Sequence, residues 1–435
     1  MEFPLTPEQQ YAFDQIESRS NNFLIHGKPG TGKSVLSRAL ISEGKKFYHI
    51  AAPTGLAALN AGGRTLHSLF AMPVSEGIID PTYNKFTTND NVLRFARYSL
   101  KHLIIDEISM VRADTFDFID RFLRMAKEND QPFGGVQIIA VGDFFQLPPV
   151  CKKDDKLNLA RVGYDSEFAF SAKAFQSFET ISLDEVLRQK GDTEFIDLLN
   201  NARMGSEYLK PKQMVSLNAR VGFEDDLRII LTGTNAQADQ VNGGHLRGLP
   251  GEPKIYQSQE FGQWPAYPCE QRLSLKVGAQ VMVKMNGADK PEGHKGAFES
   301  KVVNGTLAKI LELDENSVTV ELANGDPVKI YRKRWERKIK EKDWEGKWSE
   351  RVVSSFEQIP LALAWAISIH KSQGQTFERV HIDATKIFAA GQLYVALSRC
   401  KTLAGLTLEG RVSASKFWAN QDVVNFVKSL EPIKA

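Results

Sequence analysis

The sequence predicts an α/β fold built on parallel sheets, and three observations support this prediction. Short apolar runs alternate with helical patterns from Phe3 to about Leu183, as is typical of parallel sheets covered by helices on both faces. A glycine-rich segment, residues 27–34, lies where a strand passes into a helix. Of the 435 residues, 42% are hydrophobic and 25% are charged, as in ordinary globular proteins. The chain length suggests about three domains.

The first part of the chain contains the clearest elements. We expect a helix over residues 35–41 and strands at residues 23–25, 47–51, 103–105 and 136–141. Residues 64–98 interrupt this alternation with prolines, a glycine and a polar run, which predicts a small insertion. The first α/β domain is therefore predicted at residues 1–63 together with 99–183.

A second α/β domain is predicted at residues 184–245 together with 356–435. Its expected elements are strands at 228–231 and 379–382, a helix beginning at 235–241, and helical patterning from Leu361.

Residues 246–355 predict an inserted, SH3-like antiparallel β-module with strands at 280–284, 307–313, 318–322 and 328–331. Asn324-Gly325 is a hairpin signal, because both residues tolerate positive φ.

Composition narrows the class of protein. The 55 Lys and Arg residues nearly balance the 53 Asp and Glu residues, so nucleic acid would need a local basic groove. The three cysteines, Cys151, Cys269 and Cys400, are scattered, which disfavours a disulfide framework or a zinc site and favours an intracellular setting. We expect no membrane partner, since the longest apolar stretch, residues 359–369, is about half the length of a spanning helix.

Residues 27–34 fit the pattern G-x-x-x-x-G-K-[ST]. In this pattern, backbone N–H groups surround phosphates at a helix N-terminus. Lys33 would hold the β- and γ-phosphates, and Ser34 would ligate Mg²⁺. The sequence therefore predicts ATP and Mg²⁺ as cofactors, with binding residues Gly30, Thr31, Gly32, Lys33 and Ser34.

The apolar run 103–105 ends in Asp106 and Glu107. A carboxylate at the end of a strand beside the phosphate loop suits Mg²⁺, so Asp106 is the second predicted metal ligand. Glu107 would orient or activate the attacking water. Gln146 follows the next strand and is expected to respond to the γ-phosphate from the same sheet edge.

Two interpretations of residues 6–9 stay open. Thr6, Pro7 and Gln9 make a capping box at the start of a helix. Alternatively, Gln9 or Gln10 contacts the adenine of the nucleotide.

The other motifs separate this chain from most phosphate-loop enzymes. It has no Asn-Lys-x-Asp and no Leu-Ser-Gly-Gly-Gln, so neither a GTPase nor a transporter ATPase is supported. Asp106-Glu-Ile-Ser109 is also a poor match to superfamily 2 helicases. Six further motifs occur in order along the chain, at residues 52–55, 65–68, 141–150, 187–189, 368–375 and 391–399. This ordered set resembles that of the superfamily 1 helicases of the 5′→3′ branch, which includes RecD-like enzymes.

Within that branch the chain is most similar to the petite-integration-frequency (Pif-type) DNA helicases. Residues 120–137, with Pro132-Phe-Gly-Gly-Val136, resemble the signature of that family. The resemblance implies two RecA-like motor domains with ATP between them, and arginine fingers at Arg188 and Arg399. It also implies that Gly374 approaches the γ-phosphate. The less favoured alternatives are that Arg188 is a surface ion-pair partner of Glu185 or Asp184, and that Arg399 is a charge at a helix C-terminus.

The resemblance further implies that single-stranded DNA crosses both domains. Hydroxyl, amide and cationic side chains bind phosphates without reading sequence. The expected contacts are Thr54, Gly55, Thr65, His67, Ser68, Thr234, Asn235, Asn304, His370 and Lys371. Residues 329–351 hold ten Lys and Arg, five Asp and Glu, and four Tyr and Trp residues. They form either a base-stacking platform or a hairpin with its aromatic residues packed inward.

The predicted function is an ATP-dependent 5′→3′ DNA helicase that translocates on single strands and unwinds duplex. Residues 64–98 are the candidate wedge, tailed or forked DNA is the expected partner, and the motor is expected to be monomeric. The resemblance implies roles in DNA repair, recombination and telomere maintenance, in the cytoplasm of a bacterium or phage-infected cell, or in a eukaryotic nucleus or mitochondrion. The alternatives are a RecD-like subunit of a nuclease complex, a phosphotransferase unrelated to nucleic acid, and an ATP-gated DNA clamp.

Overall fold

The computed structural model describes residues 4–72, 77–80, 90–187, 191–222, 227–262, 264, 267–285, 302, 304–342 and 348–431. The chain folds into two compact units. The first comprises Met1–Ala219, Ile387–Leu403 and Arg411–Ala435, and the second comprises Arg220–Lys386 and Ala404–Gly410. Each unit contains its own parallel sheet.

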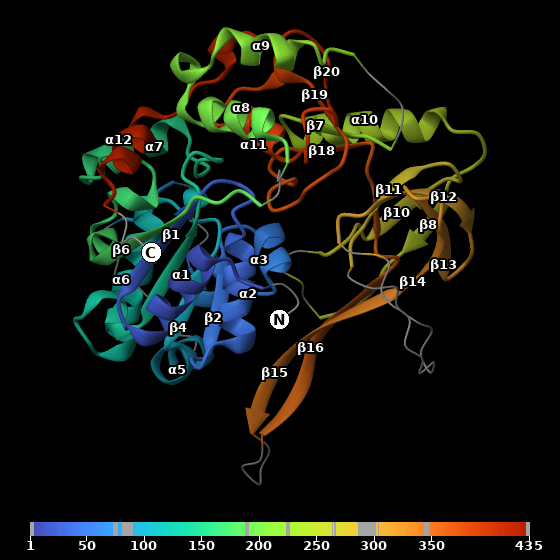
Figure 1. Ribbon diagram of the computed structural model, residues 1–435. Helices are drawn as coiled ribbons and strands as arrows, with labels where there is room; N and C mark the ends of the chain where they lie inside the picture. The colour runs from blue at the N-terminus through green and yellow to red at the C-terminus, as the bar shows by residue number, and fades with distance from the viewer. Residues whose placement is uncertain are drawn as a thin grey trace. The chain divides into compact units, whose positions relative to one another are not determined.

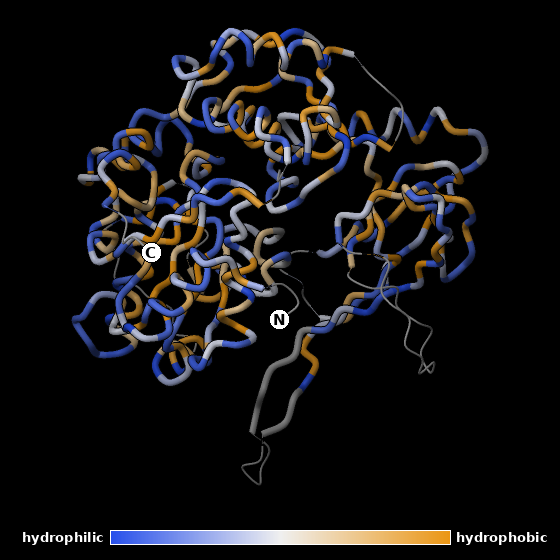
Figure 2. The backbone as a smooth tube through the Cα atoms, in the orientation of Figure 1, coloured by the Kyte–Doolittle hydropathy of each residue, from blue (hydrophilic) through white to orange (hydrophobic). Residues whose placement is uncertain are grey.

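The sheet of the first unit has the order β3-β2-β4-β5-β1-β6 within the described residues, and all neighbouring strands are parallel (Figure 1). The strands are β1 (Asn22–Gly27), β2 (Tyr48–Ala52), β3 (Arg64–Thr65), β4 (His102–Ile105), β5 (Gln137–Gly142) and β6 (Phe178–Leu183). Strands β1 and β5 are buried along their whole length, as is typical of parallel strands covered on both faces. Figure 2 shows hydrophobic segments in the interior of this unit. The four strands predicted for this region are confirmed.

The first unit also contains the helices of the first part of the chain. They are α1 (Pro7–Ser18), α2 (Lys33–Glu43), α3 (Gly55–Ala61), α4 (Leu66–Phe70), α5 (Asp90–Arg94), α6 (Ala113–Lys127) and α7 (Lys153–Arg161). Four later helices, α8 (Thr193–Met204), α9 (Pro211–Asn218), α11 (Gln392–Ser398) and α12 (Gln421–Ser429), belong to the same compact unit. These units do not follow the predicted motor-domain boundaries, which stay a prediction.

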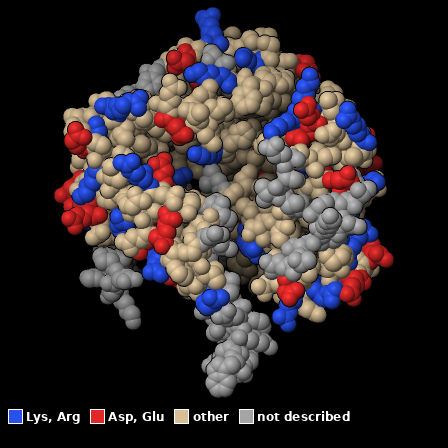
Figure 3. All heavy atoms as spheres, turned by 180° about the vertical axis from the view of Figure 1, so that it is seen from behind, with Lys and Arg blue, Asp and Glu red and all other residues tan. Residues whose placement is uncertain are grey.

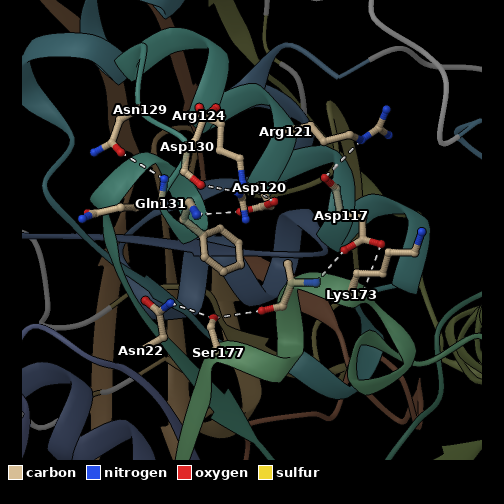
Figure 4. A network of polar contacts seen from close by, with 12 residues as sticks. Asn22, Asp117, Asp120, Arg121, Arg124, Asn129, Asp130, Gln131, Lys173 and Ser177 are labelled. Carbon is tan, nitrogen blue, oxygen red and sulfur yellow. Dashed lines mark hydrogen bonds and ion pairs between the residues drawn. The ribbon is translucent and has the colours of Figure 1, made fainter.

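The family signature has a structural explanation at the end of α6 (Figure 4). Phe133 is fully buried with a positive φ of 53°, and its N–H donates to the carboxylate of Asp120 at 2.6 Å. Gly134 also has a positive φ, and a Cβ added there would overlap the carbonyl of Leu123. The segment therefore forms a tight turn that returns the chain from α6 into β5.

The sheet of the second unit is also parallel, with the order β18-β7-β19-β20 in the described part of the chain. Its strands are β7 (Ile229–Thr232), β18 (Ala366–Ser368), β19 (Val380–Ile382) and β20 (Leu406–Leu408), and α10 (Asn235–Gly248) follows β7. Two parallel sheets with helices confirm the predicted α/β class.

The expected helix from Leu361 is wrong. This segment forms the strands β17 (Leu361–Leu363) and β18. Most residues of the apolar run 359–369 are buried, and such runs do not distinguish a buried strand from a buried helix by periodicity.

The antiparallel β-module is present in the second unit. Its main sheet has the order β14-β13-β12-β11-β17, and a separate three-stranded sheet has the order β15-β16-β9 among the described strands. The strands are β8 (Lys254–Gln257), β9 (Gln259–Phe261), β10 (Arg272–Leu275), β11 (Gln280–Val283), β12 (Leu307–Leu313), β13 (Ser317–Leu322), β14 (Pro327–Tyr331), β15 (Lys333–Lys342) and β16 (Trp348–Gln358). Gly325 turns β13 into β14 with φ of +83°, as the hairpin signal predicted.

The charged side chains on one face of the molecule are mixed rather than segregated. On the face shown in Figure 3, Lys and Arg are interspersed with Asp and Glu. In the part of the chain that is described, no helix is long and apolar enough to cross a membrane.

Candidate active site

The phosphate loop connects β1 to α2. Gly30 and Gly32 have φ of +84° and +78°, a conformation that glycine adopts without strain. The ammonium of Lys33 donates to the carbonyls of Gly27 and Lys28 at 2.7 and 2.8 Å, while Ser34 is exposed at the first turn of α2. The loop thus presents a cation, a hydroxyl and a helix N-terminus together, an arrangement that suits phosphate.

Gln9 serves two purposes. Its Oε1 accepts from Thr6 N and its N–H donates to Thr6 Oγ1, so the predicted capping box is confirmed. Its Nε2 donates to the carbonyl of Thr31 at 3.0 Å, and a Cβ added at Gly32 would collide with that amide nitrogen. The buried Gln9 side chain therefore holds the phosphate loop, and the adenine contact stays a prediction. Gln10 is exposed and donates to Asp14 instead.

The carboxylate pair lies at the carboxyl end of β4. Glu107 has φ of +53°, a left-handed conformation that is strained for a residue other than glycine and that recurs at functional sites. Its N–H donates to Asp106 Oδ1 at 2.9 Å. Burial raises the pKa of Asp106, partly opposed by the Lys33 ammonium, and burial together with Asp106 raises the pKa of Glu107 to about 7.

We expect the ATPase activity to fall at acidic pH because of Glu107. If its carboxylate accepts a proton from the attacking water, activity is full above a pKa of about 7. The activity then falls about tenfold per pH unit below that pKa. Measuring kcat/KM for ATP from about pH 5.5 to about pH 8.5 checks this, because kcat/KM reports the free enzyme. A flat profile would exclude Glu107 as the base, and Glu107→Gln should remove this pH dependence together with most of the activity.

Arg399 lies in the same compact unit as the phosphate loop. It is 1% exposed, its Nε donates to Val395 O at 3.0 Å, and its Nη2 donates to Ser398 Oγ at 2.8 Å. Burial lowers the pKa of Arg399, and the nearby Glu107 opposes this shift. A buried guanidinium that interacts electrostatically with Glu107 is more than a solvated charge at a helix end.

Arg188 lies outside the described residues. The residue before it, Leu187, donates its N–H to Gly30 O at 2.8 Å. The N–H groups of Asp184 and Glu185 donate to the Glu8 carboxylate. This segment is therefore fixed against the phosphate loop up to the residue that precedes Arg188.

Sequence reasoning missed a polar cluster around the Gln146 loop. Gln146 is buried, and its N–H donates to Asp143 O at 2.9 Å. The Asp143 carboxylate is in turn bound by Arg203 and Tyr394. Asp143 itself had a signal, since it is a carboxylate directly after a buried strand, but no local pattern marked the other two.

The predicted DNA contacts of the first unit gather at adjacent strand ends. Thr54 and Gly55 follow β2, Thr65 ends β3, and Ala52 pairs with Thr65 in the sheet. The hydroxyls of Thr54 and Thr65 cap the next helices by accepting from Ala57 N and Ser68 N. His67 is exposed, and Ser68 Oγ accepts from Arg64 at 3.1 Å.

The second unit repeats this arrangement. Thr234 and Asn235 follow β7, and His370 and Lys371 follow the neighbouring strand β18. Asn235 Oδ1 accepts from Ser368 Oγ at 2.6 Å, which joins the two strand ends. Thr234 and Lys371 are exposed, and His370 is half-buried.

Asn304 and Gly374 also belong to the second unit. Asn304 is half-buried in a turn before β12. Gly374 is exposed with φ of +72°.

The basic and aromatic segment 329–351 is largely a hairpin of β15 and β16. The Trp335 ring lies 5.8 Å from the buried Phe356 ring, which favours inward packing for this residue. Trp344 lies outside the described residues.

Comparisons with known proteins identify the family of this chain. The family model of the PIF1-like helicases matches residues 4–212, and that of the UvrD-like helicase C-terminal domain matches residues 363–407. The ATP-dependent DNA helicase RRM3 of Saccharomyces cerevisiae is 32% identical and covers 99% of this chain, which spans 68% of that protein. The chain spans 56% to 64% of the length of four further curated relatives.

Two solved structures of Bacteroides Pif1 match at 36% identity over 98% of this chain and 97% of theirs. The complex with ADP-AlF4 has a TM-score of 0.84, and the complex with single-stranded DNA has a TM-score of 0.70.

The fold and the site define an ATP-hydrolysing helicase motor, with a phosphate loop, a carboxylate pair and a buried arginine in one compact unit. More specifically, the chain belongs to the PIF1-like helicase family. The resemblance inferred from the motifs is confirmed.

Proposed function

We propose that this chain uses ATP to move 5′→3′ along single-stranded DNA as a monomer and to separate the duplex ahead of it. The observation that carries this proposal is that both parallel sheets present hydroxyl, amide and cationic side chains at the ends of adjacent strands. Such side chains grip a phosphate backbone without reading bases. The Bacteroides relative bound to single-stranded DNA supports the same partner.

The residues of the first unit would divide the work of hydrolysis. Lys33 and the loop backbone hold the phosphates, and Glu107 accepts the proton of the attacking water. Arg399 and Arg188 stabilise the charge that develops on the γ-phosphate, and Gln146 responds to that phosphate. Gln9 keeps the loop in shape.

The donor set also fits Mg²⁺. Ser34 offers an exposed hydroxyl and Asp106 a half-buried carboxylate, and Mg²⁺ prefers one or two such oxygen ligands together with phosphate oxygens. No group of three or more His, Cys, Asp or Glu residues suited to a metal occurs among the described residues. The ion would supply positive charge beside the β- and γ-phosphates.

The segment 64–98 stays our candidate for the wedge. Its first residues form β3, which pairs with β2 at the edge of the sheet, and its last described residues form α5 and a short π-helix, Phe95–Ser99. Residues 73–76 and 81–89 lie outside the described part.

Lys371→Ala tests the DNA contacts at the second sheet. Removing one phosphate contact should lower the slope of log Kobs against log salt concentration by about 0.7 for a single strand. Fluorescence anisotropy with a labelled oligonucleotide over a salt series measures this slope. Lys309→Ala, an exposed lysine on β12 of the same unit, should leave the slope unchanged, and equal slopes for both variants would contradict the contact.

A further inference from the structure

A buried polar cluster beside the phosphate loop has no role in the mechanism above. Its members are His26, Asp143, Arg203 and Tyr394, all within the first compact unit. Arg203 Nη2 lies 2.8 Å from Asp143 Oδ1, and its Nε lies 3.3 Å from both carboxylate oxygens. The Tyr394 hydroxyl donates to Asp143 Oδ2 at 3.2 Å. Arg203 Nη2 also lies 2.8 Å from His26 Nε2.

Each member is attached to a segment that handles the nucleotide. His26 directly precedes Gly27, where the phosphate loop begins. Asp143 fixes the next loop, because its Oδ1 accepts from Phe145 N at 3.2 Å and its carbonyl accepts from Gln146 N. Tyr394 lies on α11, the helix that is capped by Arg399. Arg203, from α8, therefore connects all three segments through two hydrogen-bonded partners.

Packing around the cluster leaves little freedom. The Arg203 guanidinium lies over the Phe145 ring, 4.3 Å from its centroid. Gly391, the N-cap of α11, has φ of +71°, and a Cβ added there would overlap the Phe145 carbonyl oxygen. The first turn of α11 thus touches the Gln146 loop directly, at a distance that only glycine permits.

The charges of the cluster are fixed near neutral pH. Burial by itself would raise the pKa of Asp143, but the adjacent Arg203 lowers it overall. Burial and Arg203 lower the pKa of His26 to about 3, so the neutral imidazole accepts a hydrogen bond from the guanidinium through Nε2. Arg203 and Asp143 therefore form an ion pair, the neutral His26 ring accepts a hydrogen bond from Arg203, and the Tyr394 hydroxyl donates to Asp143. We expect none of these four groups to change its charge near neutral pH.

We propose that Arg203 and Tyr394 are positioning residues that, through Asp143, set the Gln146 loop and the Arg399 helix relative to the phosphate loop. Helix α11 is joined through the chain to β19 on one side and β20 on the other, both strands of the second parallel sheet. The cluster therefore connects the two loops expected to contact the γ-phosphate to helix α11, which joins strands β19 and β20 of the second parallel sheet. This inference rests on the proposed ATPase mechanism.

Tyr394→Phe tests the inference with minimal disturbance. It removes a single hydroxyl, and Arg203 still neutralises Asp143, so no buried charge is left unpaired. The matched control is Tyr164→Phe in the same unit. The Tyr164 hydroxyl donates to Asp117 Oδ2 at 3.0 Å, and that carboxylate also accepts from Ala174 N. Lys173 N donates to the same carboxylate (Figure 4).

The readout is the ratio of two affinities, for ADP alone and for ADP with aluminium fluoride. Only interactions that strengthen in the transition state alter this ratio. We expect Tyr394→Phe to reduce the preference for ADP with aluminium fluoride, and kcat with it, about tenfold, while ADP affinity and Tm match those of the control. Arg203→Lys keeps the charge but loses the planar fork, and it should reduce the preference at least as much.

An unchanged ratio in Tyr394→Phe, or an equal loss in Tyr164→Phe, would overturn the positioning role. The two levels of failure are distinguishable. If the unmodified chain does not hydrolyse ATP, the proposed function fails. If it hydrolyses ATP and Tyr394→Phe behaves like the control, only the positioning role fails.

Discussion

Lys33→Ala is expected to lower kcat for ATP hydrolysis at least about 100-fold, since a preorganised donor at the reacting phosphate is worth that much or more. The Lys33 ammonium is held over the phosphate loop by the carbonyls of Gly27 and Lys28. The loop 27–34 contains two cationic side chains, those of Lys28 and Lys33. Steady-state ATP hydrolysis with saturating single-stranded DNA measures the effect.

Lys28→Ala is the matched control, because Lys28 contacts the ammonium of Lys33 through its backbone carbonyl, which alanine retains. It should keep most of the activity. If Lys33→Ala kept full DNA-stimulated ATP hydrolysis, this would contradict the assignment of residues 27–34 as the phosphate site.

Arg399→Lys is expected to lower kcat about 1000-fold or more, in the range of an arginine that stabilises phosphoryl transfer. Lysine keeps the positive charge near Glu107 but cannot reproduce the planar fork that binds two oxygens at once. Because the charge is retained, a fall in kcat reports lost geometry rather than an unpaired buried carboxylate.

Binding of single-stranded DNA and the Tm of Arg399→Lys should stay close to those of the unmodified chain. Arg161→Lys, at the exposed end of α7 in the same unit, is the control. A loss smaller than about tenfold in Arg399→Lys would mean that Arg399 is a structural charge at the end of α11 and not a finger.

The sequence predicts several central strands of the first sheet because they depend on local pattern. Strands β1, β4 and β5 are short apolar runs between turn signals, and each is buried against helices on both faces of its sheet. The same reasoning fails near Leu361, where burial on all sides hides the period that separates a strand from a helix.

In the candidate site, too, the residues within local motifs could be predicted, and those brought together by the tertiary fold could not. Asp106 and Glu107 were predictable because they directly follow a buried strand, and Lys33 because it lies in a local phosphate-loop motif. Arg203 and Tyr394 were not, since they reach Asp143 across 60 and 251 residues of sequence. Only the tertiary fold makes a buried arginine and tyrosine into partners of that carboxylate.

Gln9 makes two kinds of contact, and only one of them could be predicted from the sequence. The capping box fixes its Oε1, and this orientation leaves Nε2 free to bind the phosphate loop at Thr31. The sequence contained the first bond, because capping is local, but the second depends on how α1 packs against the loop.

Strand separation from tailed duplexes tests the central claim most directly. Two DNA duplexes, one with a 5′ single-stranded tail and one with a 3′ tail, are offered with Mg²⁺, with and without ATP. We expect strand release only from the 5′-tailed duplex and only with ATP. Release from the 3′-tailed duplex alone would contradict the proposed polarity, and ATP hydrolysis indifferent to DNA would contradict the helicase function itself.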